Sequence, residues 1–528
     1  MNSKPILTLG DLSLQQLALE SLVINQQINK IPSARMTLTA MTDTAGGFSS
    51  ALQSELAASR PGEKLTIAHD NQTLFSGYII SQNIILKGKT SSVILEARHA
   101  LQNLLPVRRS QIYRQQSDEQ ILRALFDTAG VELTLTQAAQ LNTQQDQIIQ
   151  FRCDDWSFIR HRLAANNCWL LPDAASPGCT IRTMGLSDEP AETIANKDNS
   201  GEDLYELEIK FDNRFTLSET VTGGWDVIQQ APGIEQRASK SPFGTDGLDV
   251  NALQTPLSRS WQQYYSYQPE PQLAQSHLNH QQIAGIRGRL LLQGTLRFRC
   301  GGTLQLSQFG AGLDGTTVVT GVQHMHDKDH GWQTELSLGM LPDDPAPLPP
   351  IDALHIAVVA PYEEDSQRLD RIPVTIPALN LSEEIVFARL GKPWASNASG
   401  FCFYPEPGDE VIIGFFEHDA RYPIILGSMH NPENKAPFAP DAANNVKALV
   451  VSREGKIEKL EFNQEQQTAT LSAGDNHLVL FNNGEINLSA NKAINVTAED
   501  ISQKASHSLA LTGDNGVEIT GNTINMKQ

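Results

Sequence analysis

The sequence predicts a mainly β protein of several domains, and three observations support this. The chain has 528 residues, which is more than usually fold around a single hydrophobic core. Short runs of alternating apolar and polar residues recur along most of the chain, a spacing typical of half-buried strands. Residues 468–528 repeat a pair of apolar residues about every eight positions. These patterns indicate strand-rich domains followed by a repetitive C-terminal tail.

The overall composition excludes some classes of protein. Apolar residues make up 40% and charged residues 19%, which is an ordinary globular balance. The net charge of −20 argues against a nucleic-acid partner, because such a partner requires a basic face. The five cysteines form no C-x-x-C pair and are typical of reduced thiols in a protein folded in the cytoplasm. We expect no signal peptide, since the N-terminus lacks a basic start followed by an apolar run.

Two strand-rich blocks flank a central segment. Residues 1–110 and 203–340 contain alternating runs bounded by Gly, Asn and Asp, as antiparallel strands do. Within the second block, residues 230–285 are richer in Gln, Ser and Pro, and we expect long surface loops there.

The central segment predicts two helices. Residues 117–131 begin at a capping residue, Ser117, and stop at Gly130, with an apolar stripe between them. Residues 154–171 repeat this design, with an apolar stripe of Trp156, Ile159, Leu163 and Ala164.

Proline-rich stretches divide the rest of the chain. Residues 340–352 predict a linker and a domain boundary. Residues 353–430 form a compact strand-rich unit, and a second loop of Pro, Asn and Ala follows at 431–445.

The tail has apolar pairs two residues apart, separated by Asn, Gly, Ser, Asp and Lys. Each pair predicts a short strand with one apolar face, followed by a tight turn. The pairs are Leu478/Leu480, Ile486/Leu488, Ile494/Val496, Leu509/Leu511, Val517/Ile519 and Ile524/Met526. A repeat of about eight residues is too short for a full coil of a single-chain β-helix. Three chains winding together would close a β-prism with these pairs on its axis, and an antiparallel meander remains the alternative.

Residues 387–437 resemble the OB-fold region of VgrG-type central spikes of contractile injection systems. The matching positions are Trp394, Pro405, Gly408, Asp409, Glu410, Val411, Phe416, Asp419, Arg421, Pro423, Ile425, Gly427 and Asn431. Residues 153–170 and 318–339 are similar to the hub of those spikes. From Gly400 onward the sequence more closely resembles the spikes of extracellular contractile injection systems, such as the antifeeding prophage and Photorhabdus virulence cassettes. Residues 394–396 read WAS, where typical type VI spikes carry W-A-G.

The resemblance implies four parts of the chain. A hub at 1–345 would hold two tube-like β-barrels with a helical segment at about 115–171. An OB-fold would span 351–430, a linker 431–447, and a C-terminal trimeric β-helix, or needle, 448–528. Trp394, Pro405, Gly408, Asp409, Glu410 and Gly427 would be structural residues of the OB-fold. The tail pairs would form the trimer axis, and Ile524 and Met526 the end that binds a tip.

The function that the resemblance implies is mechanical. A homotrimer would adapt a threefold spike to a hexameric inner tube protein, contact baseplate proteins, carry a PAAR-type tip protein and pierce a target membrane. The particle would be assembled in the bacterial cytoplasm and released. We expect no nucleic-acid partner, no cofactor, no metal and no catalytic residues.

The chain contains weak signals for ligand chemistry. A G-x-G-x-x-G pattern precedes a strand and not a helix, so it predicts a hairpin turn at Gly310, Gly312 and Gly315. Three nearby histidines, for which we expect a structural role, are His324, His326 and His330.

An enzyme or a receptor-binding tailspike is the alternative function. Glu406, Asp409 and Glu410 could serve as paired acids of a glycan-cleaving enzyme, although their Pro-Gly context predicts a solvated turn. The loop at 431–445 is too short for a lysozyme domain. A tailspike should expose aromatic sugar platforms, and Phe481 is the one aromatic residue after position 468.

Overall fold

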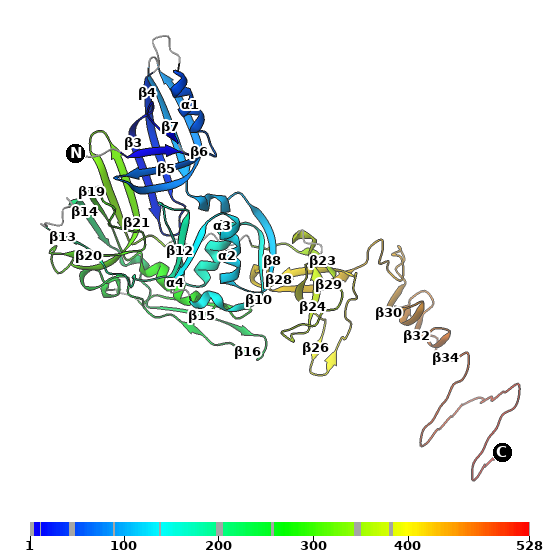
Figure 1. Ribbon diagram of the computed structural model, residues 1–528. Helices are drawn as coiled ribbons and strands as arrows, with labels where there is room; N and C mark the ends of the chain where they lie inside the picture. The colour runs from blue at the N-terminus through cyan, green and yellow to red at the C-terminus, as the bar shows by residue number, and fades with distance from the viewer. Residues whose placement is uncertain are drawn as a thin grey trace. The chain divides into compact units, whose positions relative to one another are not determined.

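The computed structural model describes residues 5–10, 12–41, 48–87, 90–136, 139–196, 204–254, 258–342, 350–379 and 384–526. The chain divides into two compact units, Met1–Met429 and His430–Gln528. The first unit contains the hub and a small closed barrel, and the second is the tail (Figure 1).

Most hub strands belong to one large sheet. Its 13 strands are β1 (Ile6–Leu9), β2 (Leu12–Ser13), β3 (Ala18–Gln27), β4 (Ser33–Met41), β5 (Lys64–His69), β6 (Gln72–Lys87), β7 (Thr90–Arg98), β13 (Glu192–Ala195), β14 (Leu204–Phe211), β19 (Ile286–Gln293), β20 (Thr303–Ser307), β21 (Gly315–Asp327) and β22 (Gly331–Leu338). Their order is β14-β19-β22-β21-β3-β4-β7-β6-β5-β1-β2, and β20 pairs with both β13 and β21.

Two hydrophobic cores lie in the two halves of this sheet. The first contains Leu38, Leu65 and Phe75, and the second contains Leu290 and Leu336, all fully buried. The halves are joined where β3 pairs with β21, from Gly321↔Gln27 to Asp327↔Ser21. The two strand-rich blocks predicted from the sequence are therefore hydrogen-bonded into one continuous sheet.

The central segment is a mixed α/β insert with its own core. Its elements are β8 (Arg108–Ser117), α2 (Asp118–Thr128), β9 (Glu132–Thr136), β10 (Gln144–Asp154), α3 (Asp155–Ala165), β11 (Cys168–Pro172) and β12 (Gly178–Thr183). The first helix is confirmed, with a capping box at Ser117 and Gly130 at φ 70° after its end. The predicted second helix extends too far, because residues 168–171 belong to the strand β11. Of the predicted stripe, Ile159 and Leu163 are buried and Trp156 and Ala164 are half-buried. The buried face also includes Phe158 and Arg162, which the predicted stripe omitted.

Two helices and three short strands were not predicted: α1 (Ser50–Ala58), α4 (Leu273–Gln282), β16 (Ala231–Pro232), β17 (Gln236–Arg237) and β18 (Ser260–Tyr265). These strands pair with β15 (Glu219–Asp226), which lies in the strand-rich block predicted at 203–340. The interpretation of 230–285 as surface loops was therefore wrong in part. The buried face of α4 includes the polar residues Ser276, Asn279 and Gln282. Because a helix is predicted from apolar residues at helical spacing, polar residues at buried positions gave no such signal.

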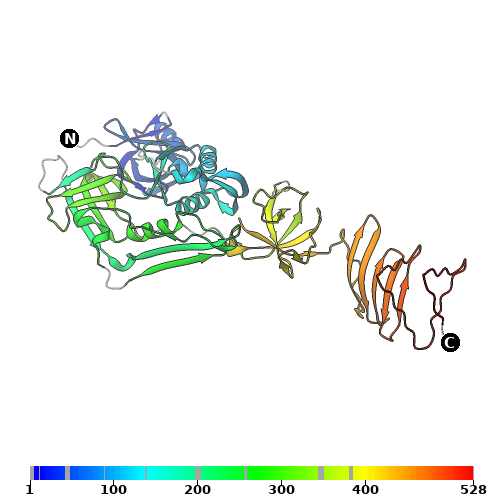
Figure 2. The same ribbon diagram turned by 90° about the horizontal axis from the view of Figure 1, so that it is seen from below.

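Residues 355–429 form a closed five-stranded barrel. Its strands are β23 (His355–Val359), β24 (Arg371–Thr375), β25 (Val386–Leu390), β28 (Glu410–Phe415) and β29 (Pro423–Met429), closed in the order β23-β24-β25-β29-β28. Alternate residues point inward, so Val374, Ala388 and Ile413 are fully buried. A short hairpin, β26 (Ala395–Ser396) and β27 (Ser399–Gly400), lies between β25 and β28. Figure 2 shows the barrel from a second side, in yellow.

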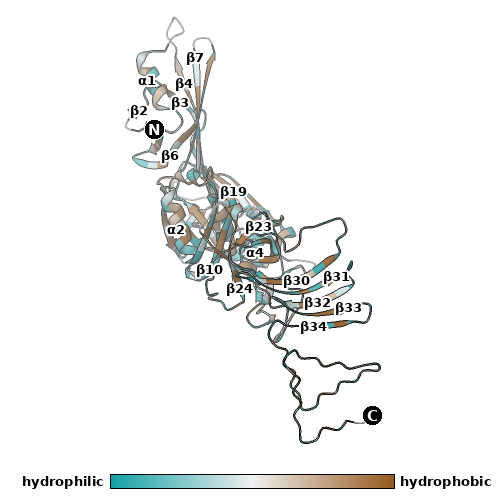
Figure 3. Ribbon diagram, turned by 90° about the vertical axis from the view of Figure 1, so that its right-hand side faces the viewer, coloured by the Kyte–Doolittle hydropathy of each residue, from teal (hydrophilic) through white to brown (hydrophobic). Residues whose placement is uncertain are grey.

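The C-terminal unit begins as an antiparallel meander. Its strands are β30 (Val446–Arg453), β31 (Lys456–Asn463), β32 (Thr468–Ala473), β33 (Asn476–Phe481) and β34 (Ile486–Ser489), each paired with the next (Figure 3). Over these strands, the single chain therefore adopts the alternative that the sequence left open. No strand is assigned among the described residues 490–526.

Candidate functional site

The meander of the C-terminal unit has one apolar face. Strand register places Leu449, Leu460, Leu471, Leu478 and Leu488 in a row across the five strands. A second row on the same face contains Phe462, Ala469, Leu480 and Ile486. The opposite face carries polar residues such as Lys459, Ser472, His477 and Ser489. We call the two apolar rows the needle face.

The needle face is exposed in the single chain. Leu488 is 58% exposed and Ile486 69%, whereas a core position of the barrel such as Ile413 is fully buried. Apolar side chains on this scale are seldom left uncovered in a soluble protein. The predicted axis pairs Leu478/Leu480 and Ile486/Leu488 thus lie side by side on one surface.

The later axis residues are also exposed, but the chain does not bring them onto the needle face. Ile494, Val496, Leu509, Leu511, Val517 and Ile519 are each at least half exposed, as are the predicted tip residues Ile524 and Met526. They lie in the extended part of the chain after β34.

The OB-fold motif residues mostly form a turn at one edge of the barrel. The Gly408 N–H donates to the Val359 carbonyl at 2.9 Å, and Gly408 has φ 94°, which favours glycine. The Asp409 carboxylate accepts the Glu406 backbone N–H at 2.9 Å. Pro405 precedes this turn, Glu410 begins β28, and Gly427 lies in β29 opposite Ile412.

Trp394 lies elsewhere. It precedes β26, outside the barrel strands, and 56% of its surface is exposed. The motif therefore includes a tryptophan that contributes nothing to the barrel core.

A buried ion network joins the hub to the barrel. Arg162 of α3 forms a bidentate pair with Asp118 at 2.6 and 2.8 Å, and also contacts Glu270 at 3.0 Å. Arg421 of the barrel donates to the same Glu270 carboxylate at 2.6 Å and pairs with Asp419 at 2.8 Å. Glu270 thus connects one arginine from each part.

This network perturbs the acidity of its members. Burial by itself would raise the pKa of Glu270, but Arg162 and Arg421 outweigh burial and lower it to about 2. Burial is likewise outweighed at Asp419, where Arg421 lowers the pKa to about 2. The pKa of His161 is lowered to about 4, first by burial and then by Arg162. The ion pairs therefore stay charged at neutral pH while His161 stays neutral.

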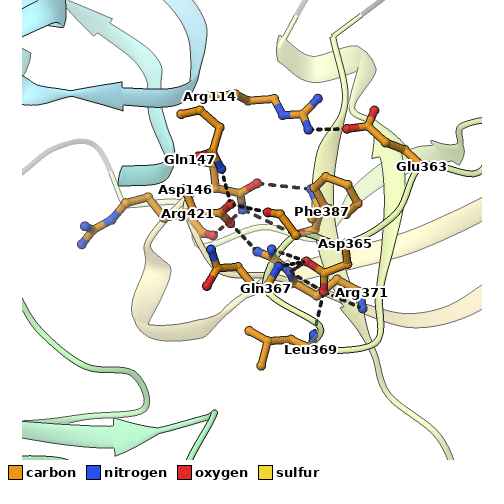
Figure 4. Close-up of polar contacts among 12 residues, drawn as sticks. Arg114, Asp146, Gln147, Glu363, Asp365, Gln367, Leu369, Arg371, Phe387 and Arg421 are labelled. Atoms are coloured by element: carbon orange, nitrogen blue, oxygen red, sulfur yellow. Dashed lines mark hydrogen bonds and ion pairs between the residues drawn. The ribbon is translucent and has the colours of Figure 1, made fainter. Parts of the chain in front are cut away.

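A second polar contact fastens β10 of the hub to the barrel (Figure 4). The Gln147 side chain accepts from the Phe387 N–H at 3.2 Å and donates to the Arg421 carbonyl at 2.7 Å. Arg371 pairs with Asp146 at 2.8 Å and with Asp365 at 2.6 Å. We call the two sets of contacts the hub–barrel joint.

Sequence reasoning missed most of the joint. Arg421 and Asp419 stood in the recognised motif, but Gln147, Asp146 and Glu270 belong to no motif. Arg162 carried a usable signal, since a charged residue on the apolar side of a helix predicts a buried partner.

The structure provides little for ligand or metal chemistry. Within the described ranges, no group of three or more His, Cys, Asp or Glu side chains is placed to hold a metal ion. His324 contacts Thr334 at 3.1 Å, whereas His330 contacts Asp327 at 3.1 Å. The predicted hairpin turn at Gly310–Gly315 is confirmed, because β20 pairs with β21 around it. In the part of the chain that the structure describes, no helix is long and apolar enough to span a membrane.

The curated proteins similar to this chain include spike proteins of type VI secretion systems. The type VI secretion system spike protein VgrG3 of Vibrio cholerae is 24% identical over 383 residues, which is 65% of this chain and 36% of that protein. The spike protein VgrG2a of Pseudomonas aeruginosa is 29% identical over 174 residues, 30% of this chain and 20% of that protein. The chain therefore spans well under half the length of these relatives.

Solved structures share the fold. The Francisella PdpA–VgrG complex in its lidded form has a TM-score of 0.62 at 10% identity, covering 92% of this chain and 79% of that one. An E. coli type VI secretion component, described as similar to the T4 tail proteins gp27 and gp5, has a TM-score of 0.51 at 12% identity, covering 80% of this chain and 99% of that one.

Two family models match the chain. The model of the type VI secretion system/phage-baseplate injector OB domain matches residues 355–430, the region of the closed barrel. The model described as the Alg8 N-terminal domain matches residues 2–327, more than half of the 528 residues. The chain therefore belongs to the Alg8 N-terminal domain family and carries a phage-baseplate-type OB domain after it.

Proposed function

We propose that this chain is the homotrimeric central spike of a contractile injection machine. The similarity to VgrG spike proteins and to phage tail proteins supports a structural spike of a phage-tail-like injection system. The observation that supports a trimer is the exposure of the needle face. Its two apolar rows are exposed in one chain and would be buried if three chains packed them on a common axis.

In this role the hub meets the hexameric inner tube protein and baseplate proteins, and the needle crosses the target membrane mechanically. The exposed Ile524 and Met526 at the C-terminal end would bind a separate PAAR-type tip protein. The spike would belong to an extracellular, released particle assembled in the bacterial cytoplasm. It would have no catalytic activity of its own, because the Asp409 carboxylate has a structural partner in the turn, the Glu406 N–H at 2.9 Å.

Sedimentation of the purified protein tests the central proposal. We expect three times the chain mass at micromolar concentration and a threefold particle with a projecting spike in electron micrographs. A stable monomer would contradict the proposal.

Two further assays address the finer points. Deleting 517–528 should abolish capture of a PAAR-type tip protein, and the truncated chain should still sediment as a trimer. The intact trimer should leave purified peptidoglycan undegraded, and clearing of cell wall would show that the chain is an enzyme.

A further inference from the structure

The barrel carries a protruding arm that its own chain leaves uncovered. Residues 391–405, which we call the barrel arm, connect β25 to β28 and contain the β26–β27 hairpin. Every residue from 393 to 404 is exposed. Figure 1 shows β26 lying away from the barrel strands. The arm is thus a projection and not part of the barrel wall.

The arm concentrates aromatic side chains on its surface. Trp394 is 56% exposed, Phe401 47%, Phe403 52% and Tyr404 45%. The buried core of the barrel combines residues of its strands with Ile112, Ile149 and Phe151 of the hub, and none of the four rings belongs to it. Clustered exposed aromatics are the residue type that anchors protein interfaces.

The base of the arm is held in place. The Tyr404 hydroxyl donates to Asp370 at 3.0 Å, and the Lys392 ammonium lies 4.0 Å from the centre of the Tyr404 ring. The Phe401 N–H donates to the Trp394 carbonyl at 3.0 Å. A projection that is ordered before binding loses less conformational entropy when it docks.

The outer wall of the barrel offers a matching surface. Leu354, Ile356 and Leu426 are 64%, 51% and 54% exposed. Leu354 and Leu426 lie near Gly414, where an added Cβ would come within 3.6 Å of Leu426 and 3.7 Å of Leu354. Ile356 pairs with Ile412, which lies opposite Gly427. Gly427, beside them in β29, has open space where its Cβ would be. The three exposed aliphatic side chains and the two glycines form an apolar surface, which we call the barrel patch.

We infer that the barrel arm of each copy packs onto the barrel patch of the next copy in the trimer. This inference rests on the proposed trimer. Copies that each carry a net charge of −20 repel one another, so they should meet on surfaces that lack acidic groups. The arm contains one lysine and no Asp or Glu, and the patch is aliphatic. An arm-to-patch contact is head-to-tail, and a threefold rotation closes it into a ring.

Cross-linking from the arm tests which surface covers it. A photoreactive amino acid replaces Phe403 in the full chain, the trimer is isolated by sedimentation, and cross-linked peptides are identified by mass spectrometry. We expect bands at two and three chain masses, with the cross-links in β23, β28 or β29 of another copy. A trimer without intermolecular cross-links, or with cross-links outside these strands, would overturn the inference. A monomer would overturn the proposed function as well, so the two failures are distinguishable.

Substitutions test the contribution of the contact. The double change Phe401→Ser with Phe403→Ser, or Gly427→Glu alone, should speed subunit exchange between labelled and unlabelled trimers at least tenfold. The barrel should keep its melting temperature, because these positions are exposed in the single chain. Tyr362→Ser is the control for lost exposed aromatic surface, since Tyr362 is 85% exposed and lies outside the arm. Gly312→Glu is the control for added charge, because Gly312 of the hub also has open space. Exchange rates equal to those of the controls would refute the contact.

Discussion

The barrel and the meander both have five strands, but the barrel buries its apolar side chains and the meander leaves them exposed. The barrel closes on itself, so Ile413 and Val411 of β28 are fully buried within one chain. The meander stays open, and Leu471 and Leu488 are each 58% exposed. A closed sheet satisfies its own core, whereas an open one-faced sheet needs a partner. The barrel is thus stabilised within one chain, whereas the meander requires contacts with another chain.

The largest expected effect comes from charge on the proposed axis. Replacing Ile494 and Val496 with Asp should abolish the trimeric needle and injection, because six carboxylates would be buried together on the axis. The hub and barrel should still fold, since both residues are at least half exposed in the single chain. Sedimentation and a delivery assay measure the loss, and Asn495→Ser is the near-neutral control. A double Asp variant that assembles and delivers cargo normally would refute the prism.

Breaking the hub–barrel joint should be the next largest effect. Arg162→Ala leaves Asp118 and Glu270 buried with lost partners, and we expect the free energy of unfolding to fall by about 3–5 kcal/mol. Denaturant titration of a chain truncated to Met1–Met429, which lacks the needle face, measures this. The exposed Arg297, paired with Glu192, is the control, and its replacement with Ala should leave the melting temperature unchanged. Equal stability of the two variants would show that the joint contributes little.

Matched truncations test the comparison of barrel and meander directly. Ile413→Ala removes buried methyl groups and should reduce the free energy of unfolding by about 2–5 kcal/mol. Leu488→Ala removes similar groups from the needle face and should leave the unfolding of the single chain unchanged. It should instead weaken the trimer, as dilution followed by sedimentation would detect. A destabilised monomer with Leu488→Ala would mean that the needle face is covered within one chain.

The smallest expected effect is a two-step acid response of the joint. Unfolded histidine binds a proton near pH 6.5, while burial lowers the His161 pKa to about 4, so stability should fall as pH drops from 6.5 to 4. The Glu270 and Asp419 pKa values of about 2 lie below their ordinary 4.5 and 3.8. Their contribution is complete above pH 4.5 and is lost as pH falls toward 2. Thermal melts across this range measure both steps.

A His161→Asn variant separates the two steps. It should reduce the step between pH 6.5 and 4, to which His324 also contributes because burial lowers its pKa to about 4 as well. It should keep the lower step, because Glu270 and Asp419 remain in place. An unchanged profile in this variant would assign the upper step to another group.

Local patterns in the sequence were enough to predict several elements. Ser117 and Gly130 define α2 because capping and a left-handed stop depend on a few neighbouring residues. The spacing of Gly310 and Gly315 before a strand predicted the hairpin, since turn geometry is also local. The apolar pairs of the tail predicted short strands with one apolar face, because side chains alternate along any strand.

Only the tertiary structure decided how distant parts meet. The pairing of β3 with β21, which makes one sheet of two blocks, links residues some 300 positions apart and leaves no local signature. The same holds for Gln147 against Phe387 and for Glu270 between Arg162 and Arg421. The sequence around a polar residue does not indicate which distant residue it will contact. Only the folded structure shows which buried charge it compensates. Trp394 shows the converse: its place in a motif predicted a structural role, but exposure depends on what surrounds it in three dimensions.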